Sequence, residues 1–402
     1  MALSESHPSK KIRVLTFTSL YPNREQQRHG IFVETRMKEL IQNYPVEITV
    51  VAPIPWFPIK HKIFGQYGVY AAIPKREIRH GMTIHHPRYL VIPKIGMNLA
   101  PLLMALSLWP TMKKLQQQNF DLIDAHFIYP DGVVAVLFSK ILKLPSIITA
   151  RGNDITLYPH YWLPRRLIIW AVNQCSAVIS VCRYLSEEIK KLGVMQNNNL
   201  VMRNGVDLER FSPRNRDEIR AKLKLNSFTL ISVGHFIERK GHHFIIEALT
   251  QLPDVKLILI GDGPMDKELR ALAIFHQVEE RVIFTGAIKQ EQLADYYSAA
   301  DCMVLASSRE GWANVLLESM ACGTPVVATA VSGTPEVVLN ETAGQLISDR
   351  SAAGITSGIQ ALRQHYPDRG AVREYANNFD WQETTAHLYE LIHRIHTEHK
   401  PK

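Results

Sequence analysis

Residues 302–329 read CMVLASSREGWANVLLESMACGTPVVAT, and this stretch contains a complete strand, helix and strand. The apolar runs Cys302–Leu305 and Val326–Ala328 predict two short buried strands. Between them, a polar loop leads into a mostly apolar helix that begins near Ala313. Such a connection predicts two parallel strands, because the helix carries the chain back to the end of the sheet where the first strand began. The stretch therefore indicates an α/β fold.

The same alternation of short apolar runs and longer amphipathic stretches occupies most of the chain. Polar, charged residues at Asp207–Asn226 separate two series of strands and read as a linker with a short helix, which puts the domain boundary near Pro213. We expect two doubly wound, Rossmann-like domains facing each other across a cleft, with functional loops at the carboxyl ends of the strands. Ten further strands are predicted: Ile12–Thr18, Glu47–Ala52, Asp121–His126, Ser146–Thr149, Ala177–Val181, Leu200–Met202, Thr229–Val233, Lys256–Ile260, Val282–Phe284 and Gln345–Ile347.

The length and the charge of the chain limit its partners. A chain of 402 residues with 46% hydrophobic and 21% charged residues has ordinary globular composition and is long enough for two or three domains. Residues 1–205 contain 25 Lys and Arg against 12 Asp and Glu, and the rest contain 21 against 26, so the two parts carry +13 and −5. The basic part favours lipid headgroups, a phosphorylated ligand or nucleic acid as partner, unless its charges are simply scattered over a solvated surface.

Three local features concern the compartment. The four cysteines form no C-x-x-C pair and lie among apolar residues, so we expect packed thiols in a reducing compartment. Residues 1–11 lack the apolar segment of a secretory signal, which favours a cytoplasmic protein. The uncharged stretch Ile95–Met112 contains Pro101 and Pro110, so it predicts a buried or interfacial helix around Leu99–Trp109 rather than a membrane span.

Glu310 and Glu318 lie eight residues apart within the quoted stretch. If the helix begins near Ala313, Glu310 ends the loop and Glu318 lies one to two turns into the helix, so both carboxylates can face one ligand. The helix is otherwise apolar, so Glu318 needs hydroxyl or amide donors, which a ribose diol would supply. The N–H groups at the start of the helix would suit a diphosphate. A pair of solvated surface glutamates is the plain alternative.

With its flanks Ala299–Asp301 and Pro325–Ala328, the quoted stretch closely resembles the E-x7-E signature of glycosyltransferase family 4. The resemblance runs from about Ile12 to His396. It implies a GT-B fold, in which the C-terminal domain holds a nucleotide-activated sugar and the N-terminal domain holds the acceptor, and it implies a retaining enzyme. The run that follows Phe379-Asp380-Trp381 resembles the family's last helix, which crosses back to the N-terminal domain. The expected domains are residues 1–208 together with a helix at about 382–398, and residues 209–381.

The resemblance also implies roles for residues of the C-terminal domain. The stretch Val233–Gly241 is similar to the family's diphosphate-binding segment, in which Lys240 matches a lysine. An arginine is usual where His235 stands, so Arg239 or another cation would compensate. Glu310 would contact sugar hydroxyls near the anomeric carbon without acting as a covalent nucleophile. The implied catalytic residues are Glu310, Lys240 and His126, and the implied donor-binding residues are Glu318, His235, Gly234, Gly311, Trp312, Asn314, Val315, Gly286 and Ile288.

Three segments of the N-terminal part complete the resemblance. His29–Thr35 is similar to the family's first strand-to-helix loop, where Gly30 would bring the backbone close to a phosphate or to the acceptor. Asp124–Phe127 and Arg151–Asp154 match the family's H-x-H-F and H-G-x-D patterns in part, with the first histidine of each replaced. We expect His126 near the transferred sugar, unless it is a structural strand-end histidine. The implied acceptor or phosphate loop consists of Gly30, Asp154 and Arg151, whose guanidinium suits an anionic group.

The resemblance implies the reaction and its partners. We expect a hexosyl group to pass from a UDP- or GDP-sugar to a glycan or lipid-linked acceptor in polysaccharide or cell-surface glycan biosynthesis. The chain contains no D-x-D motif, so we expect no metal and no cofactor. The alternatives are a catalytically silent nucleotide-sugar-binding subunit, a sugar-nucleotide epimerase, which the E-x7-E arrangement argues against, and a nucleic-acid binder. The sequence shows no nucleic-acid-binding module, so we expect no nucleic-acid partner.

Two segments of the N-terminal part concern the location of the protein. Ile54–Phe64 and Leu163–Trp170 mix cations with aromatic residues, which suits the headgroup region of an anionic membrane. Ordinary core packing with lysines extended into solvent is the alternative. We expect a cytoplasmic protein that can associate peripherally with the inner face of the cell membrane.

Overall fold

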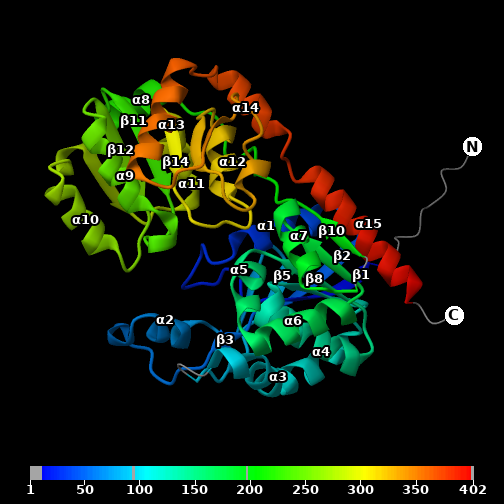
Figure 1. Ribbon diagram of the computed structural model, residues 1–402. Helices are drawn as coiled ribbons and strands as arrows, with labels where there is room; N and C mark the ends of the chain where they lie inside the picture. Colours follow the sequence, from blue (N-terminus) through cyan, green and yellow to red (C-terminus); the bar gives the residue numbers. More distant parts are fainter. Residues whose placement is uncertain (1–10, 93–95, 196–197, 400–402) are drawn as a thin grey trace, which may run out of the picture. The chain divides into compact units, whose positions relative to one another are not determined.

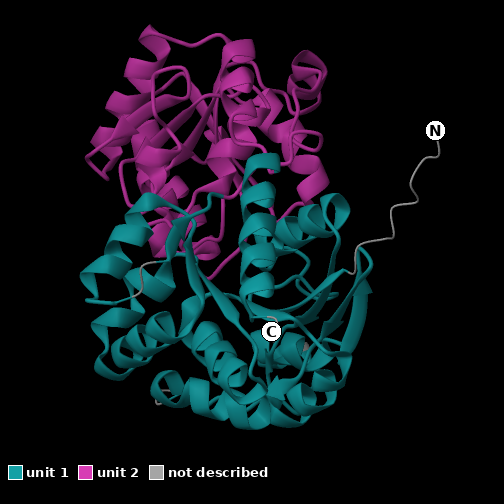
Figure 2. Ribbon diagram, turned by 90° about the vertical axis from the view of Figure 1, so that its right-hand side faces the viewer, with its two compact units in different colours: residues 1–203, 382–402 teal, residues 204–381 magenta. Residues whose placement is uncertain are grey.

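The computed structural model describes residues 11–92, 96–195 and 198–399, and the chain divides into two compact units (Figures 1 and 2). Unit 1 comprises residues 1–203 and 382–402, and unit 2 comprises residues 204–381. Residues 1–10 and Ile95, which enter the sequence predictions above, lie outside the described residues.

Unit 1 is built on an eight-stranded sheet in the order β10-β9-β8-β7-β1-β2-β5-β4. Its neighbouring strands are parallel except β4 and β5. A separate parallel pair is formed by β3 and β6. The strands are β1 (Ile12–Phe17), β2 (Val46–Val51), β3 (Ile54–Pro55), β4 (Arg76–Arg79), β5 (Met82–His85), β6 (Arg88–Tyr89), β7 (Leu122–His126), β8 (Ser146–Ala150), β9 (Ala177–Ser180) and β10 (Asn199–Val201).

The antiparallel hairpin of β4 and β5 is absent from the sequence predictions. Its strands alternate polar and apolar residues instead of forming an apolar run. Polar side chains are acceptable there because β4 is the edge strand of the sheet. The connecting residues His80 and Gly81 have φ values of 48° and 81°, as a two-residue hairpin turn requires. This His-Gly turn was the available signal for the hairpin.

The helices of unit 1 surround the sheet (Figure 1). They are α1 (Ile31–Asn43), α2 (Gln66–Ala72), α3 (Gly96–Leu115), α4 (Val133–Leu142), α5 (Asn153–Thr156), α6 (Trp162–Gln174), α7 (Arg183–Lys191) and α15 (Gln382–Glu398). As predicted, the last helix returns to the N-terminal domain: Leu388 and Ile392 of α15 share a core cluster with Met37 of α1. The ring of Tyr389 also stacks on Tyr44, with centroids 4.4 Å apart.

α3 forms where the sequence predicts a buried or interfacial helix. It runs through 20 residues although Pro101 and Pro110 lie inside it. Met104, Leu108 and Met112 on its inner face are fully buried. Among the described residues, no helix combines the length and the hydropathy needed to cross a membrane.

Unit 2 is built on a six-stranded parallel sheet in the order β13-β12-β11-β14-β15-β16. Its core joins strand residues such as Leu257 to Ile245 and Ile359 of the covering helices. The predicted strands of both units are all present, with ends that differ by at most two residues. The strands are β11 (Phe228–Val233), β12 (Val255–Ile260), β13 (Val282–Gly286), β14 (Cys302–Leu305), β15 (Val326–Thr329) and β16 (Gly344–Ile347). The helices are α8 (Arg216–Lys222), α9 (His242–Ala248), α10 (Asp266–Phe275), α11 (Gln290–Ala299), α12 (Asn314–Ala321), α13 (Ala352–Gln364) and α14 (Arg369–Asn377).

The structure divides the chain between residues 203 and 204, five residues before the predicted boundary at 208/209. The backbone N–H of Val206 donates to the carbonyl of Phe379 across 2.8 Å. Gly205 packs so closely on Asp380 that a Cβ there would lie 2.6 Å from the Asp380 carbonyl oxygen. These contacts attach residues 204–206 to the end of unit 2, so the division falls before them.

The segment Asp207–Asn226, predicted as a linker, belongs to unit 2. Arg373 of α14 donates to the carbonyls of Leu208 and Phe211 across 2.9 and 2.5 Å. The predicted short helix is α8, and the side chain of Asn215 caps its start. A guanidinium that binds two carbonyls holds this segment on the domain surface.

The four cysteines are buried, and none forms a disulfide, which agrees with their predicted packing. Burial raises the pKa of Cys322 to about 12, so its thiol stays protonated at neutral pH.

Candidate active site

The predicted donor residues of unit 2 lie in loops that follow parallel strands. Gly234 and His235 follow β11, Gly286 ends β13, and residues 306–313 connect β14 to α12. Because all six strands are parallel, the loops at their carboxyl ends meet at one edge of the sheet. The structure therefore gathers residues that are far apart in the sequence.

The loop after β11 and the loop after β14 are in direct contact. Gly241 has a φ of +67°, and a Cβ at this position would lie 2.1 Å from the carbonyl oxygen of Ala306, so only glycine permits the approach. The backbone N–H of Ser308 donates to the carbonyl of Arg239 across 2.9 Å. These contacts hold the lysine and the first glutamate of the predicted site against each other.

Lys240 and Glu310 form an ion pair at this junction. Nζ of Lys240 lies 2.5 Å from Oε1 of Glu310, and the hydroxyl of Ser307 donates to the same oxygen across 2.6 Å. Nη1 of Arg239 lies 3.5 Å from it. Burial alone would raise the pKa of Glu310, but the charges of Lys240 and Arg239 and the two hydrogen bonds hold that pKa below its usual value. Glu310 is therefore an ionised carboxylate beside two cations.

Glu318 has a different environment, although it lies only eight residues further along the chain. Its Oε2 accepts a hydrogen bond of 3.0 Å from the hydroxyl of Tyr297, a fully buried residue of α11. Burial raises the pKa of Glu318 to about 7, against the opposing hydrogen bond from Tyr297 and the charge of Arg210. Both protonation states are thus populated at neutral pH. A ligand diol that donates hydrogen bonds to this carboxylate would favour the ionised form.

His235 does not extend the cationic group. Its Nδ1 lies 3.4 Å from Oδ1 of Asp262, in the loop after β12, and its side chain is 56% exposed. Arg239 lies instead beside Glu310, so two cations, Lys240 and Arg239, flank that carboxylate.

The other predicted donor residues lie in the same loops or, for Asn314 and Val315, in the first turn of α12. The carbonyl of Gly286 accepts from the N–H of Gly261 across 3.1 Å, which connects two of these loops. Trp312 is buried, and the centroid of its ring lies 6.2 Å from that of Phe379. Partly exposed residues are Gly234, Gly311, Asn314, Val315 and Ile288.

His126 lies inside a buried polar cluster of unit 1. Its Nδ1 lies 2.7 Å from Nη2 of Arg151, and its Nε2 lies 3.2 Å from Oδ2 of Asp124. The side chains of His126 and Asp124 are both about 1% exposed. A guanidinium can only donate, so Nδ1 accepts, and the proton of the neutral ring belongs on Nε2, toward Asp124. The ring of His126 is thus held between Arg151 and Asp124.

The protonation of His126 follows from this burial. Burial lowers its pKa to about 4, and the charge of Arg151 adds to the effect while Asp124 opposes it. The ring is neutral at physiological pH and cannot serve as a general acid there. Arg36, also fully buried, faces the same cluster and donates to the carbonyl of Met202 across 2.9 Å.

Asp154 connects two loops of unit 1. Its carboxylate accepts from the backbone N–H groups of Ile128, Arg151 and Gly152 at 2.7 to 3.1 Å. These bonds link the loop after β7 to the loop after β8. Burial raises the pKa of Asp154 although the same hydrogen bonds oppose it. The aspartate of the R-G-N-D motif thus has a structural role.

Gly30 has a steric role at the start of α1. Its φ is +69°, and a Cβ would lie 2.3 Å from the carbonyl carbon and oxygen of Leu20. Gly30 thus packs directly on the backbone of Leu20. The guanidinium of Arg151 lies over the ring of Phe32, 5.1 Å from its centroid. The first turn of α1 and the loop after β8 therefore meet.

Three polar residues of these sites are absent from the predictions. Arg36 could have been found, because Val33, Arg36 and Leu40 share one face of α1 and a charge on a buried face needs partners. Tyr297 and Ser307 had no such signal. Each meets its glutamate only through the tertiary fold.

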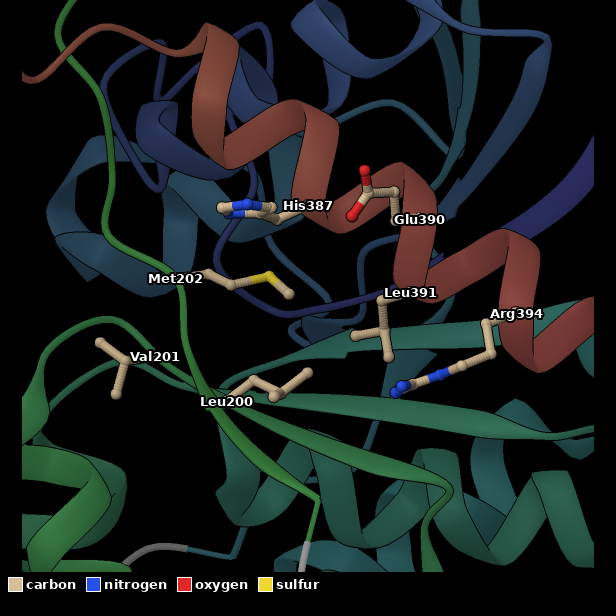
Figure 3. A pocket seen from close by; sticks show the side chains of 7 residues that line it. All are labelled: Leu200, Val201, Met202, His387, Glu390, Leu391 and Arg394. Carbon is tan, nitrogen blue, oxygen red and sulfur yellow. The ribbon is translucent and has the colours of Figure 1, made fainter.

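A separate cavity in unit 1 is lined by none of the predicted site residues. It measures about 400 Å³ and lies between the end of β10 and the side of α15 (Figure 3). Leu200 and Met202 form one wall, and His387, Glu390 and Arg394 of α15 form the other.

Two family models match the chain. One match lies within unit 2, and the other lies mostly within unit 1. The model described as "Glycosyl transferases group 1" matches residues 215–379, and the one described as "Glycosyltransferase Family 4" matches residues 46–210.

Curated relatives match as well. TuaC of Bacillus subtilis (strain 168), a glycosyltransferase whose name assigns it provisionally to teichuronic acid biosynthesis, is 30% identical over 391 residues. The match covers 95% of this chain and 94% of TuaC. N-acetyl-alpha-D-glucosaminyl L-malate synthase of Bacillus anthracis is 28% identical over 256 residues, covering 62% of this chain and 67% of the synthase.

Solved structures share the fold. The sucrose-phosphate synthase from Thermosynechococcus elongatus has a TM-score of 0.78 at 20% identity, covering 96% of this chain and all of that chain. HepE of Anabaena in complex with UDP has a TM-score of 0.71 at 20% identity, with the same coverage. These likenesses, with the two parallel sheets, show the GT-B fold. Together with the full-length match to TuaC, they show that the chain belongs to glycosyltransferase family 4 and is a glycosyltransferase.

Proposed function

We propose that this enzyme moves a hexosyl group from a UDP- or GDP-sugar to a glycan or lipid-linked acceptor during the biosynthesis of a cell-surface polysaccharide. It would do so with retention of configuration and without a metal ion. The observation that carries the proposal is the arrangement of Lys240, Glu310 and Glu318 at the strand ends of unit 2. The names of relatives support it, since TuaC is named for teichuronic acid and HepE is described with UDP.

In this proposal unit 2 binds the donor. Glu318 accepts hydrogen bonds from the ribose diol, and Glu310 contacts sugar hydroxyls. As the bond between the anomeric carbon and the diphosphate breaks, negative charge collects on the leaving phosphate oxygen. Lys240 and Arg239 stabilise that charge. An ammonium has three N–H donors, so Lys240 can keep its contact with Glu310 while it binds a phosphate oxygen.

The proposed independence from metal rests on the sequence and on these cations. A nucleotide diphosphate needs positive charge, which enzymes supply by Mg²⁺ or Mn²⁺ on carboxylates or by protein cations. This chain has no D-x-D motif, whereas Lys240 and Arg239 both lie beside Glu310. We expect full activity in EDTA.

Unit 1 would bind the acceptor, with Arg151 as the group that recognises an anionic substituent such as the phosphate of a lipid carrier. His126 then acts as a positioning residue, because its Nδ1 holds the guanidinium of Arg151. The enzyme would work in the cytoplasm, at the inner face of the cell membrane, where a lipid-linked acceptor is accessible.

A catalytically silent nucleotide-sugar-binding subunit is the second candidate. It is favoured by one observation: where the family usually has an arginine, this chain places His235 beside the carboxylate of Asp262. A weaker cationic site could bind a donor without activating it.

A ligand panel followed by a turnover assay tests both candidates. We expect UDP or GDP, with its sugar, to raise the thermal midpoint, because a ligand that binds only the folded state stabilises it. We also expect release of free nucleotide from that sugar when a lipid extract supplies acceptors. Glu318→Gln should lose the stabilisation, and Glu341→Gln, at an exposed glutamate of the same unit, should retain it. A flat panel would contradict the donor site, and stabilisation without nucleotide release would favour the silent subunit.

A further inference from the structure

Three packed helices of unit 1 expose a surface that is both apolar and cationic. α3 packs against α4, and α4 packs against α6 (Figure 1). Across these helices the sequence has five Lys and Arg residues and no Asp or Glu. We call this the three-helix surface and define it by the exposed side chains Leu99, Leu102, Leu106, Trp109, Lys113, Lys140, Ile141, Trp162, Arg166 and Trp170.

The exposed apolar residues of α3 form a single row. Leu99, Leu102, Leu106 and Trp109 are spaced by three, four and three residues, and Lys113 follows four residues later. This spacing puts all five on one face of the helix. Leu102 and Leu106 are 56% and 65% exposed, whereas the opposite face of α3 is buried in the core. The helix is therefore apolar on both sides.

The row on α3 continues onto its neighbours. The ring of Trp109 stacks on Phe138 of α4, with centroids 6.4 Å apart and an interplanar angle of 18°. α4 exposes Ile141 beside its lysine, and α6 exposes Trp162 at 68%. The guanidinium of Arg166 lies over the Trp162 ring, 5.4 Å from its centroid. Tryptophans with adjacent cations are thus present on two of the three helices.

We propose that the three-helix surface docks on the anionic face of a lipid bilayer. The leucines would enter the boundary of the acyl chains, and the tryptophans and cations would lie at the level of the headgroups. The partner is argued from charge. A second copy would bring the same cations without a carboxylate to pair with them, whereas anionic headgroups complement every cation of the surface.

The surrounding sequence has the same charge character. Residues 48–120 contain nine Lys and Arg and a single acidic residue, Glu77. Glu77 already has an internal partner, because Nε2 of His86 lies 2.7 Å from its Oε1. An acidic protein could also match this charge, but a bilayer alone accommodates leucines and tryptophans spread over three helices without a complementary shape.

This inference rests on the proposed function, because a lipid-linked acceptor is the reason for the enzyme to bind a membrane. The experiment that tests it does not depend on that acceptor. The three-helix surface includes none of the proposed donor or acceptor residues. Binding to lipid can therefore be measured without donor, acceptor or turnover.

The experiment is flotation of the purified full chain with vesicles. One set contains phosphatidylcholine alone, and a second contains phosphatidylcholine with phosphatidylglycerol, each at low and at high salt. We expect binding to the anionic vesicles at low salt, with at least a tenfold weaker partition at high salt or without the anionic lipid. Absence of binding to anionic vesicles at low salt would overturn the proposal.

Variants locate the surface. Leu102→Ser/Leu106→Ser should weaken binding at least tenfold, and Lys113→Glu/Arg166→Glu should remove the preference for anionic lipid. The matched controls lie on unit 2: Ile274→Ser/Phe275→Ser changes apolar residues of α10 that are at least as exposed, and Lys224→Glu/Lys267→Glu changes exposed lysines. Both controls should bind like the unaltered chain.

The outcomes separate the possible partners and the two proposals. Unchanged binding by the leucine variant would overturn the surface assignment, as would equal losses in the controls. Concentration-dependent dimerisation that Leu102→Ser/Leu106→Ser abolishes, with no lipid binding, would assign the surface to a second copy. Thermal stabilisation by nucleotides is measured separately from lipid binding. A failure to bind lipid therefore leaves the transferase proposal intact, and a failure to bind nucleotides leaves the membrane proposal intact.

Discussion

The hydroxyl of Tyr297 donates a hydrogen bond to Oε2 of Glu318 across 3.0 Å. Tyr297 comes from α11 and Glu318 from α12, and β14 with its long loop lies between them in the sequence. The bond leaves the carboxylate with one defined orientation and partly offsets the effect of burial on its pKa. Tyr297 therefore orients Glu318, and in the proposed donor site it need not touch the ligand itself.

Tyr297→Phe should weaken nucleotide-sugar binding roughly tenfold, because a hydrogen bond to a charged group contributes about 1.5 kcal/mol or more. The pH midpoint of binding should also move upward, since the hydrogen bond that lowers the pKa of Glu318 is gone. Titration calorimetry at several pH values measures both effects. Tyr296→Phe makes the same change one residue away and should alter neither. Unchanged affinity and midpoint in Tyr297→Phe would exclude a positioning role.

Nucleotide-sugar affinity should depend on the ionisation of Glu318. Its pKa of about 7 lies above the ordinary value of 4.5, so the carboxyl is mostly neutral at pH 6 and mostly ionised at pH 8. If the ribose diol binds only the ionised form, affinity rises through this interval by roughly tenfold. A nucleotide sugar is the correct probe, because its diphosphate diester does not titrate in this range.

Glu318→Gln tests that assignment. It should bind the nucleotide sugar with an affinity lower by roughly 1–3 kcal/mol at pH 8 and independent of pH. If the affinity of this variant depended on pH as strongly as that of the unaltered chain, another group would be responsible for the titration. Glu341→Gln should keep the pH dependence of the unaltered chain.

Lys240→Ala should lower turnover by roughly 10²–10³-fold, with a smaller effect on donor affinity, because its charge stabilises the leaving diphosphate. The change also leaves Glu310 without its closest cation. Lys240→Ala/Glu310→Gln removes that unpaired charge and should regain thermal stability without regaining turnover. Recovery of turnover in the double variant would show that the lysine acts only on the fold.

His126→Ala should destabilise unit 1 by about 2–4 kcal/mol, since it leaves Asp124 and Arg151 buried without their shared partner. His126→Gln keeps an acceptor for Arg151 and should recover part of the loss. Nucleotide binding should be unchanged in both variants. Thermal unfolding and calorimetry check these outcomes. A pH–rate profile that loses an ionisation between pH 6 and 7 in His126→Gln would contradict the neutral, positioning histidine.

Asp131 should make unit 1 less stable as the pH rises. Its Oδ2 accepts from the N–H and hydroxyl of Ser19 at 2.6 and 2.7 Å, yet burial raises its pKa to about 7. The ordinary value is 3.8, so between about pH 4 and pH 7 the unfolded chain has released a proton that the folded chain retains. Stability is therefore lost through this interval.

Asp131→Asn removes this titration. We compare the free energy of unfolding of the variant with that of the unaltered chain. This difference should favour the variant more at pH 8 than at pH 4.5, by on the order of 2–4 kcal/mol. Hydrogen exchange of the peptides around β7 and β8 reports on unit 1 specifically. An equal effect at both pH values would show that Asp131 titrates normally in the folded protein.

Much of the fold followed from local patterns. Strands buried on both faces are apolar along their whole length, so the runs at Thr229–Val233 and Cys302–Leu305 were visible in the sequence. The hairpin at Arg76–His85 was not, because an edge strand can carry alternating polar residues. The division after Arg203 lies five residues before the predicted boundary, because it depends on contacts with residues near Phe379 that no local pattern reveals.

The candidate site, too, was predicted from the sequence only in part. Lys240, Glu310 and Glu318 could be selected from the sequence, because the motifs that carry the family resemblance are local strand–loop–helix segments. Their different environments required the folded chain. One glutamate meets two cations and the other a buried tyrosine, because the crossovers bring β11, β14 and α11 together. The burial of His126 likewise could not be predicted from the sequence, because it depends on which other segments of the fold pack over this residue.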